Sequence, residues 1–318
     1  MRERHVTLAV DMGGTAWKAA VMRDGRALAF DSMPNRSRVE DLEELSTLFD
    51  RLLQDAGSSL QSCAGLGISL AEIVDSDAKA CPSPCYKHPY FEGHEVEPIL
   101  RQFIDLPVQI DNDSRASILG EEAYGVLSNL GSGAENVVMV TLGTGIGVAA
   151  RVNGTLLRGA RHTGGLLSGH ITVDMNGPRC ICGNIGCPEA LASGYALANY
   201  APGRPWFAES SLAGEAGPTF RMLTDAVRQG DKHAKTGLDE MCDAWTALLV
   251  SLVHAFGPAH LALSGGFMRS ADLFLDGIEQ AVRQRLWDPN LMPEIHVAEE
   301  PELSGVRGCE VLVRRAIN

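Results

Sequence analysis

The chain has 318 residues, of which 45% are hydrophobic, and a formal net charge of −13. This charge argues against a nucleic-acid or anionic-membrane surface, and no apolar run is long enough for a transmembrane helix. The eight cysteines show no spacing typical of a disulfide framework, and no signal peptide precedes the first strand-like run. Both features predict a soluble cytoplasmic protein. The length suits one large domain or two medium ones.

The first predicted feature is a β-hairpin with a polar turn. Strands are expected over residues 6–11, 17–23 and 27–32, and the first turn reads Asp11-Met-Gly-Gly-Thr15. The backbone N–H groups and the Thr15 hydroxyl of such a turn suit phosphate oxygens, while Asp11 suits Mg²⁺ held through water. A plain glycine hairpin is the alternative, because two glycines mark many turns.

An amphipathic helix is predicted over residues 40–56 and a buried strand over 65–70. The stretch from Ser69 to His94 is irregular and rich in Pro and Cys, which is typical of loops that line ligand sites. Within it we interpret Cys81 and Cys85 as a pair of loop thiols, since no further metal ligands are evident.

The segment Asp111-Asn-Asp-Ser114 lies between a predicted strand, residues 107–110, and an Ala-rich helix that extends to about residue 124. Asp, Asn and Ser are ordinary helix caps, so each has a purely structural explanation. A helix capped by Asn112 would nevertheless leave Asp113 in its first turn. There the helix dipole favours the ionised carboxylate, which suits a general base.

Two further glycine turns follow. Leu142-Gly-Thr-Gly-Ile-Gly147 connects predicted strands at 137–141 and 148–152, and with the first turn it would clasp a polyphosphate. Ser264-Gly-Gly266 ends a strand at 260–263, and a helix is expected from about Ala271 with Ser270 as its cap. Helices are also predicted at 189–199, 220–229 and 231–256, then a strand at 294–298 and a helix from about 305.

The densest cluster of metal-ligating side chains is His170, Cys180, Cys182 and Cys187, the cysteines forming a C-x-C-G-x-x-G-C pattern. One imidazole and three thiolates form a complete tetrahedral set for a structural Zn²⁺. Ordinary buried cysteines, or a disulfide with a spare thiol, are the alternatives. Glu189 follows the last cysteine closely, so a loop held by the metal would position its carboxylate for a polar ligand.

In motif order and over nearly the whole chain, the sequence resembles the ROK family of repressors, open reading frames and sugar kinases. The matching motifs are the first two glycine turns, Ser264-Gly-Gly266 as the adenosine motif, and Gly169-His170 with Cys180–Glu189 as the zinc signature. The resemblance implies a duplicated actin/hexokinase-like (ribonuclease H-like) α/β fold with a structural zinc loop. Its small lobe would be residues 1–113 plus 305–318 and its large lobe residues 114–304. It also implies ATP with Mg²⁺, a hexose substrate, and a homodimer.

Carried over residue by residue, the resemblance makes Asp113 the catalytic base and Asn112, His170 and Glu189 sugar contacts. His170 would also bind zinc with the three cysteines. The nucleotide would contact the three glycine motifs, at Asp11, Gly13, Gly14, Thr15, Gly143, Thr144, Gly145, Gly265 and Gly266. Repressors of the family carry an N-terminal helix-turn-helix, and the first strand begins too early here to leave room for one. The implied function is therefore an ATP-dependent sugar kinase.

Two departures bear on the substrate. Family members usually have a glutamate three residues before the histidine, and here that position is Leu167. The segment after residue 67 also lacks the usual Pro-Gly pair. Glu72 could replace the missing acid, or could be an ordinary acid of a surface loop. Either the kinase takes an atypical sugar, or the site has decayed into a sugar-binding sensor without turnover. Retention of the base and both phosphate turns favours the kinase.

Overall fold

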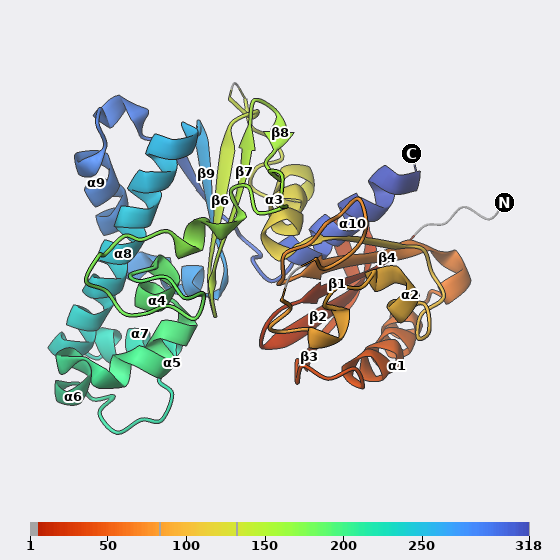
Figure 1. Cartoon of the computed structure of the whole chain (residues 1–318), viewed down its shortest axis with the longest axis horizontal. Helices are drawn as coiled ribbons and strands as arrows, with labels where there is room; N and C mark the ends of the chain where they lie inside the picture. Colours follow the sequence, from red (N-terminus) through yellow and green to blue (C-terminus); the bar gives the residue numbers. More distant parts are fainter. Residues whose placement is uncertain (1–5, 83, 132, 318) are drawn as a thin grey trace. The chain divides into compact units, whose positions relative to one another are not determined.

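The computed structural model describes residues 6–82, 84–131 and 133–317. The chain forms two compact units, each built on a five-stranded mixed sheet with helices packed against it (Figure 1). Among the described residues, the first unit comprises 6–82, 84–131, 158–164 and 298–317, and the second comprises 133–157 and 165–297. The predicted α/β class is confirmed.

The first sheet has the strand order β3-β2-β1-β4-β5. Its strands are β1 (Val6–Met12), β2 (Ala16–Arg23), β3 (Arg26–Pro34), β4 (Cys63–Leu70) and β5 (Val108–Asn112). The first three form an antiparallel meander, while β4 and β5 run parallel to β1. In the parallel register Asp11 pairs with Ser69 and Ser69 with Asp111, so the polar strand ends gather at one edge of the sheet.

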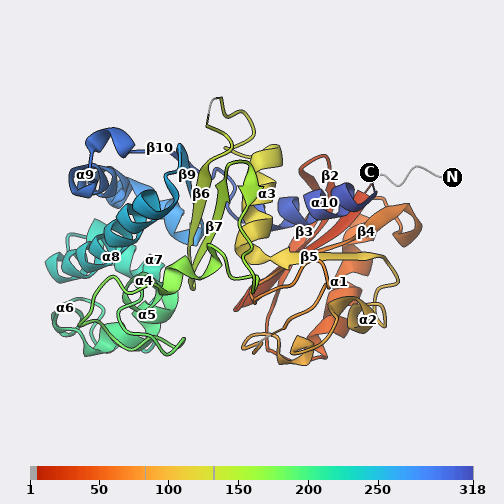
Figure 2. The ribbon, with the colours of Figure 1, turned by 45° about the horizontal axis from the view of Figure 1, so that its top comes forward.

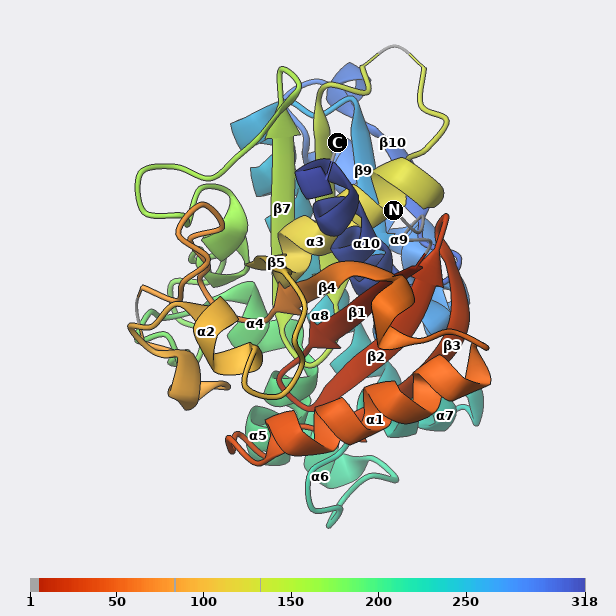
Figure 3. The same ribbon diagram turned by 90° about the vertical axis from the view of Figure 1, so that its right-hand side faces the viewer.

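Helices cover both faces of this sheet, and Figure 3 shows α1 and α10 on opposite sides of it. The helices of the unit are α1 (Asp41–Asp55), α2 (Val96–Leu100), α3 (Asp113–Tyr124) and α10 (Ser304–Ile317). Alternate residues of β1 serve the two faces: Leu8 and Val10 belong to the core under α1, whereas Ala9 packs with Val306 and Cys309 of α10. Small residues on this second face let α10 lie close to the strands.

The second sheet has the order β10-β9-β6-β7-β8. Its strands are β6 (Val137–Leu142), β7 (Ile146–Val152), β8 (Thr155–Leu156), β9 (His260–Ser264) and β10 (Glu294–Val297). Its helices are α4 (Pro188–Ala192), α5 (Gly194–Tyr200), α6 (Pro205–Glu209), α7 (Phe220–Arg228), α8 (Lys232–Phe256) and α9 (Leu275–Arg285). Figure 2 shows these helices on one side of the sheet, and their core is centred on the buried Trp245 of α8, packed against Phe220 and Phe267.

Most predicted elements are present, with shifted ends. Strand β5 continues through Asn112 instead of ending at residue 110. The helix expected from Ala271 begins only at Leu275, because residues 266–273 form a 3-10 helix with a kink at Ser270. Among the described residues, no helix has both the length and the apolar character needed to cross a bilayer.

The division into units does not follow the predicted lobes. Helix α3 packs against α10 in the first unit, whereas the sequence led us to place residues after Asp113 in the large lobe. The contact is close at two glycines: a Cβ on Gly120 would lie 2.2 Å from the Ser304 carbonyl oxygen, and one on Gly308 would lie 1.8 Å from that of Ala116. The lobes as functional domains stay a prediction.

Candidate active site

The first glycine turn joins β1 to β2 at the polar edge of the first sheet, and Asp11 is fixed there. Its Oδ1 accepts a hydrogen bond from Ser69 Oγ at 2.7 Å, and its Oδ2 lies 3.4 Å from Lys18 Nζ. The start of α10 packs against the same carboxylate, since a Cβ on Gly305 would come within 2.7 Å of Asp11 Cγ. The carboxylate is therefore held at the turn, and it keeps a partly exposed face.

Asp113 is the first residue of α3, and its half-buried side chain is oriented by its neighbours. Its Oδ1 accepts hydrogen bonds from Asn112 Nδ2 and from the Ser114 N–H, both at 2.8 Å. None of the described residues of the first unit donates to its Oδ2. One oxygen thus orients the carboxylate while the other is available to a ligand.

Burial raises the pKa of Asp113 to about 6; the Lys87 ammonium opposes this shift and the Asp11 carboxylate reinforces it. We expected the helix dipole to favour the ionised form, but burial outweighs it. A carboxylate with a pKa just below neutral is ionised at pH 7 and is still basic enough to accept a proton in a reaction.

Asn112 is the N-cap of α3 and is buried. Its Oδ1 accepts from the N–H groups of Ser114 and Arg115, at 2.9 and 3.3 Å. Its Nδ2 donates to the Glu72 carbonyl at 3.0 Å as well as to Asp113. Protein groups therefore occupy both ends of this amide, which ties β4 to the base. Its predicted contact with a sugar hydroxyl stays a prediction.

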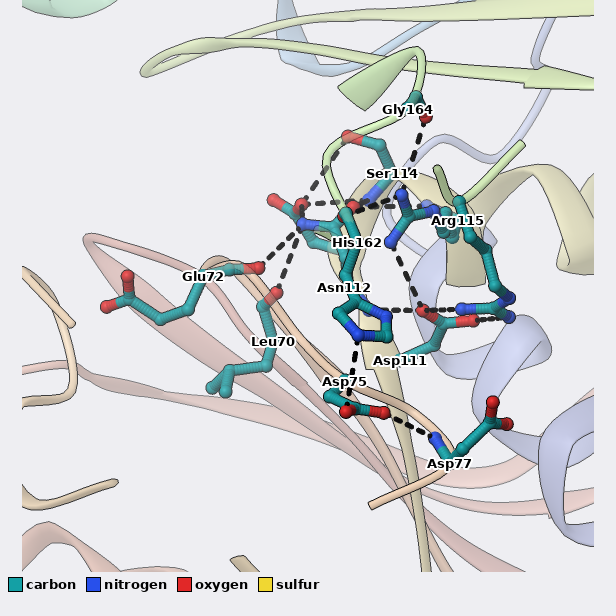
Figure 4. Close-up of polar contacts among 12 residues, drawn as sticks. Leu70, Glu72, Asp75, Asp77, Asp111, Asn112, Ser114, Arg115, His162 and Gly164 are labelled. Atoms are coloured by element: carbon teal, nitrogen blue, oxygen red, sulfur yellow. Dashed lines mark hydrogen bonds and ion pairs between the residues drawn. The ribbon is translucent and has the colours of Figure 1, made fainter. Parts of the chain in front are cut away.

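A charged cluster that the sequence did not reveal lies directly before the base (Figure 4). The fully buried Asp111 carboxylate pairs with Arg158, through Nη1 at 3.0 Å and Nη2 at 2.5 Å. Arg115 Nη2 donates to the His162 carbonyl at 2.8 Å, and His162 Nε2 lies 3.2 Å from Asp75 Oδ2. These contacts attach residues 158–164 to β5 and α3, the two elements that meet at Asp113.

The irregular stretch after β4 is held by a buried acid. Glu72 Oε1 accepts hydrogen bonds from the N–H groups of Lys87 and His88, at 2.6 and 3.0 Å. His88 is itself fully buried, and its Nε2 accepts a hydrogen bond from Trp17 Nε1 at 3.2 Å. Glu72 is thus an internal anchor, and its interpretation as a surface acid was wrong. Cys81 and Cys85 form no disulfide, and both side chains are buried in the hydrophobic core of the first unit.

In the second unit, the turn Gly143-Thr144-Gly145 lies between β6 and β7. The N–H groups of Gly194 and Tyr195 bind the carbonyls of Gly143 and Thr144, at 2.8 and 2.9 Å, so the start of α5 supports the turn. The turn is also adjacent to the adenosine motif, because Thr141 pairs with Ser264 across β6 and β9.

The third glycine motif requires one of its two glycines. Gly265 has φ +96°, and a Cβ there would lie 2.3 Å from the Leu142 carbonyl oxygen. A Cβ on Gly266, in contrast, would meet no atom within 4 Å. Gly265 therefore allows β9 to turn against the end of β6, and Gly266 leaves backbone uncovered by side chain.

Glu189 connects the second turn to the cysteine loop. Its Oε2 accepts the Ile146 N–H at 3.0 Å, and a Cβ on Gly145 would come within 2.6 Å of the same oxygen. Its Oε1 lies 3.9 Å from His170 Nε2. Gly169 brings the histidine close to β7, since a Cβ there would lie 2.2 Å from the Ile146 carbonyl oxygen.

The four predicted zinc ligands converge, with their ligand atoms all within 4.8 Å of one another. Cys180 Sγ lies 3.6 Å from His170 Nδ1, and Cys182 Sγ lies 3.7 Å from Cys187 Sγ. Tetrahedral zinc, with bonds of about 2.3 Å to sulfur and about 2.0 Å to nitrogen, requires separations of about 3.8 Å between sulfurs and about 3.6 Å between sulfur and nitrogen. The side chains therefore fit the ion, and none of the three cysteines forms a disulfide.

Leu167 lies in the 3-10 helix Leu166–His170, three residues before the candidate metal ligand His170. Its side chain is 43% exposed, which is high for a leucine beside a candidate site. This position, where the resemblance leads us to expect an acid, thus presents methyl groups to solvent.

Two α/β units, each with a glycine turn at the ends of its central strands, define the class of duplicated nucleotide-binding folds that includes the hexokinases. Within that class, the model of the ROK family matches residues 7–316, and the chain belongs to this family. Glucokinase from Streptomyces coelicolor is 30% identical, with 97% of this chain and 98% of that protein covered. N-acetylgalactosamine kinase AgaK from a Shewanella species is 29% identical, with 95% of each covered.

The fold of a solved relative agrees with the sequence comparison. A ROK family glucokinase from Streptomyces griseus, in complex with glucose and AMPPNP, superposes with a TM-score of 0.78 at 28% identity, over 98% of this chain and 99% of that one. The predicted hexokinase-like α/β fold is confirmed.

Proposed function

We propose that the chain is an ATP-dependent carbohydrate kinase that transfers the γ-phosphoryl group of ATP to a sugar hydroxyl. The observation that carries the proposal is Asp113, whose one oxygen is fixed by two hydrogen bonds while the other is available. This base lies within electrostatic range of Asp11 on the glycine turn, because the Asp11 carboxylate helps to raise the pKa of Asp113. The names of the relatives support the same activity.

In the proposed reaction, Asp113 accepts the proton of the attacking hydroxyl. As the family resemblance implies, the Asp11–Thr15 turn, the Gly143–Gly145 turn and Gly265-Gly266 would bind the nucleotide, and Asp11 would hold Mg²⁺. The metal supplies charge neutralisation when bound. Glu189, oriented by the Ile146 N–H, and His170 would contact sugar hydroxyls. Positioning and electrostatics account for nearly all catalysis of such transfers.

We also propose that His170, Cys180, Cys182 and Cys187 bind a structural zinc ion. The sulfur and nitrogen separations support a closed tetrahedral site. With Nδ1 of His170 directed at the cysteines and Nε2 at Glu189, the ion would fix the side chain that touches the sugar. A homodimer remains our expectation from the resemblance, and a cytoplasmic location remains our expectation from the composition.

The alternative is a sugar-binding sensor without turnover, and Leu167 is the observation that favours it. A site that loses a hydroxyl acceptor can lose several orders of magnitude in discrimination when the hydroxyl stays unpaired. The intact surroundings of Asp113 favour the kinase, because a sensor has no use for an oriented base.

The deciding experiment measures ADP release with ATP and Mg²⁺ over glucose, mannose, fructose, allose and their N-acetylated and deoxy counterparts. Turnover on one sugar, abolished in Asp113→Asn, is the expected result. Binding of a sugar detected by thermal shift, with no ADP released on any member of the panel, would replace the kinase with the sensor.

A further inference from the structure

Lys87 is a positively charged residue that none of the roles above uses, and it lies against the first glycine turn. A Cβ on Gly14 would come within 2.8 Å of both Lys87 Cδ and Cε, and within 3.2 Å of its Nζ. The residue is exposed, and no acid among the described residues forms an ion pair with it. Its aliphatic stem is therefore laid along the turn, with the ammonium group accessible to a ligand.

The backbone under Lys87 is fixed from two directions. Glu72 accepts its N–H at 2.6 Å, and Asn35 Nδ2 donates both to the Gly13 carbonyl at 3.0 Å and to the Lys87 carbonyl at 3.5 Å. The neighbouring His88 is buried and bonded to Trp17 of β2. These buried hydrogen bonds hold Lys87, within an otherwise irregular stretch, against the first glycine turn. An ordinary solvated lysine needs no such support.

The ammonium also acts on the base. Its charge lowers the pKa of Asp113, and after burial it is the largest influence on that carboxyl group. Lys87 is thus close enough to the Gly14 backbone to touch it and close enough to Asp113 to affect its protonation. A phosphoryl group that passes from the turn to a hydroxyl beside Asp113 would travel between two groups that both lie near this ammonium.

We propose that Lys87 Nζ binds an oxygen of the phosphoryl group that is transferred. The proposal rests on the proposed kinase activity and deepens it by adding a catalytic residue. In the step, the acceptor oxygen forms a bond to the γ-phosphorus and the bond from that phosphorus to the β–γ bridging oxygen breaks. The hydroxyl proton passes to Asp113, and Lys87 stays protonated while it offsets the negative charge on the equatorial oxygens.

The same ammonium would suit an acceptor that carries its own anionic group, such as a sugar acid. The contact with Gly14 favours the phosphoryl group, because it places the amine on the turn that carries the phosphate motif rather than at a separate position. The anionic acceptor is accordingly one outcome of the test.

The test compares Lys87→Gln and Lys87→Arg with wild type, and uses Lys232→Gln of α8 as the control for loss of a surface lysine. For Lys87→Gln we expect kcat to fall at least about tenfold with a smaller change in KM for the sugar. The acid limb of the kcat/KM profile should move to higher pH, since the charge that lowers the pKa of Asp113 is gone. Lys87→Arg should restore part of kcat, and Lys232→Gln should match wild type. Unchanged kcat and an unchanged pH profile in Lys87→Gln would overturn the proposal.

A binding measurement separates this proposal from the activity on which it rests. Wild type should bind AMPPNP more tightly than ADP, and Lys87→Gln should reduce that preference about tenfold. If wild type releases no ADP with any sugar, the kinase fails, and an unaltered preference in the variant would then refute the lysine contact as well. A loss confined to KM for acidic sugars, with kcat and the nucleotide preference intact, would assign Lys87 to the acceptor and overturn the phosphoryl contact.

Discussion

A single methyl group added to the second glycine turn should weaken sugar binding and ATP binding separately, depending on which glycine carries it. In Gly145→Ala, the new Cβ would lie 2.6 Å from Glu189 Oε2, and ordinary contact begins at 3.4 Å, so the carboxylate has to move by about 0.8 Å. That movement breaks its 3.0 Å hydrogen bond with the Ile146 N–H. Hydrogen bonds to charged groups contribute about 1.5–3 kcal/mol, and the lower end applies to a partly exposed carboxylate.

The measurement pairs urea unfolding with steady-state kinetics. Gly145→Ala should lose about 1.5 kcal/mol of unfolding free energy, and KM for the sugar should rise about tenfold because Glu189 is displaced. Gly143→Ala is the matched control in the same turn: its Cβ meets no atom within 4 Å, so stability should be unchanged. Its defect should appear in KM for ATP, since the methyl group covers backbone proposed to face phosphate. Wild-type stability and sugar affinity in Gly145→Ala would refute the assignment of Glu189.

Three further predictions concern the base, the metal and the packing of α10. Asp113, with its pKa raised from 3.8 to about 6, destabilises the fold when ionised, so wild-type stability should fall as pH rises through that window. Measured by urea unfolding, the unfolding free energy of Asp113→Asn should exceed that of wild type by up to about 3 kcal/mol at pH 7.5, and the two should be equal below pH 4. A lower unfolding free energy of the variant at pH 7.5 would contradict this. Cys182→Ser should lose the bound zinc and have a lower Tm, whereas Cys242→Ser, outside the cluster, should keep the zinc and the wild-type Tm. Metal analysis that finds zinc in Cys182→Ser would refute the site. Gly308→Ala should destabilise by about 2–3 kcal/mol in the same urea assay, because its Cβ would lie 1.8 Å from a carbonyl oxygen of α3. Gly277→Ala, in the first turn of α9 where a Cβ meets no atom within 4 Å, should gain up to about 0.5–1 kcal/mol. Equal stabilities would refute the packing argument.

Local sequence patterns predicted the elements well wherever local and tertiary preferences agree. The leucines of α1 recur at helical spacing and are buried as a set. The failure near Ser270 has a tertiary cause. Phe267 stacks on Phe220 with ring centroids 3.8 Å apart, and Phe267 and Met268 are both buried, so packing holds the chain in a 3-10 helix past the expected cap. No pattern within one window of sequence contains that partner.

The same distinction divides the site. The glycine turns and the Cys/His cluster are contiguous motifs, and the sequence located them. Arg158 and Asp111 are 47 positions apart, and their pairing became visible only when the chain was folded. Burial is equally non-local: it turned Glu72 from an expected surface acid into an internal anchor, and it made the pKa of Asp113 rise although the helix terminus alone favours the opposite.

The anchoring of Glu72 bears directly on what the kinase accepts. An acid can replace the one missing at Leu167 only if its carboxylate is available to a hydroxyl. Oε1 of Glu72 already accepts two backbone N–H groups, and the side chain is buried beneath the stretch that carries Lys87. Withdrawing it to bind a sugar would leave both N–H groups without their acceptor, each at a cost of about 1–3 kcal/mol. Compensation that withdraws Oε1 is therefore unfavourable, and burial of the side chain disfavours access of a sugar hydroxyl to Oε2. The methyl groups of Leu167 favour an acceptor that has no hydroxyl to pair at that position, or that carries an apolar substituent there.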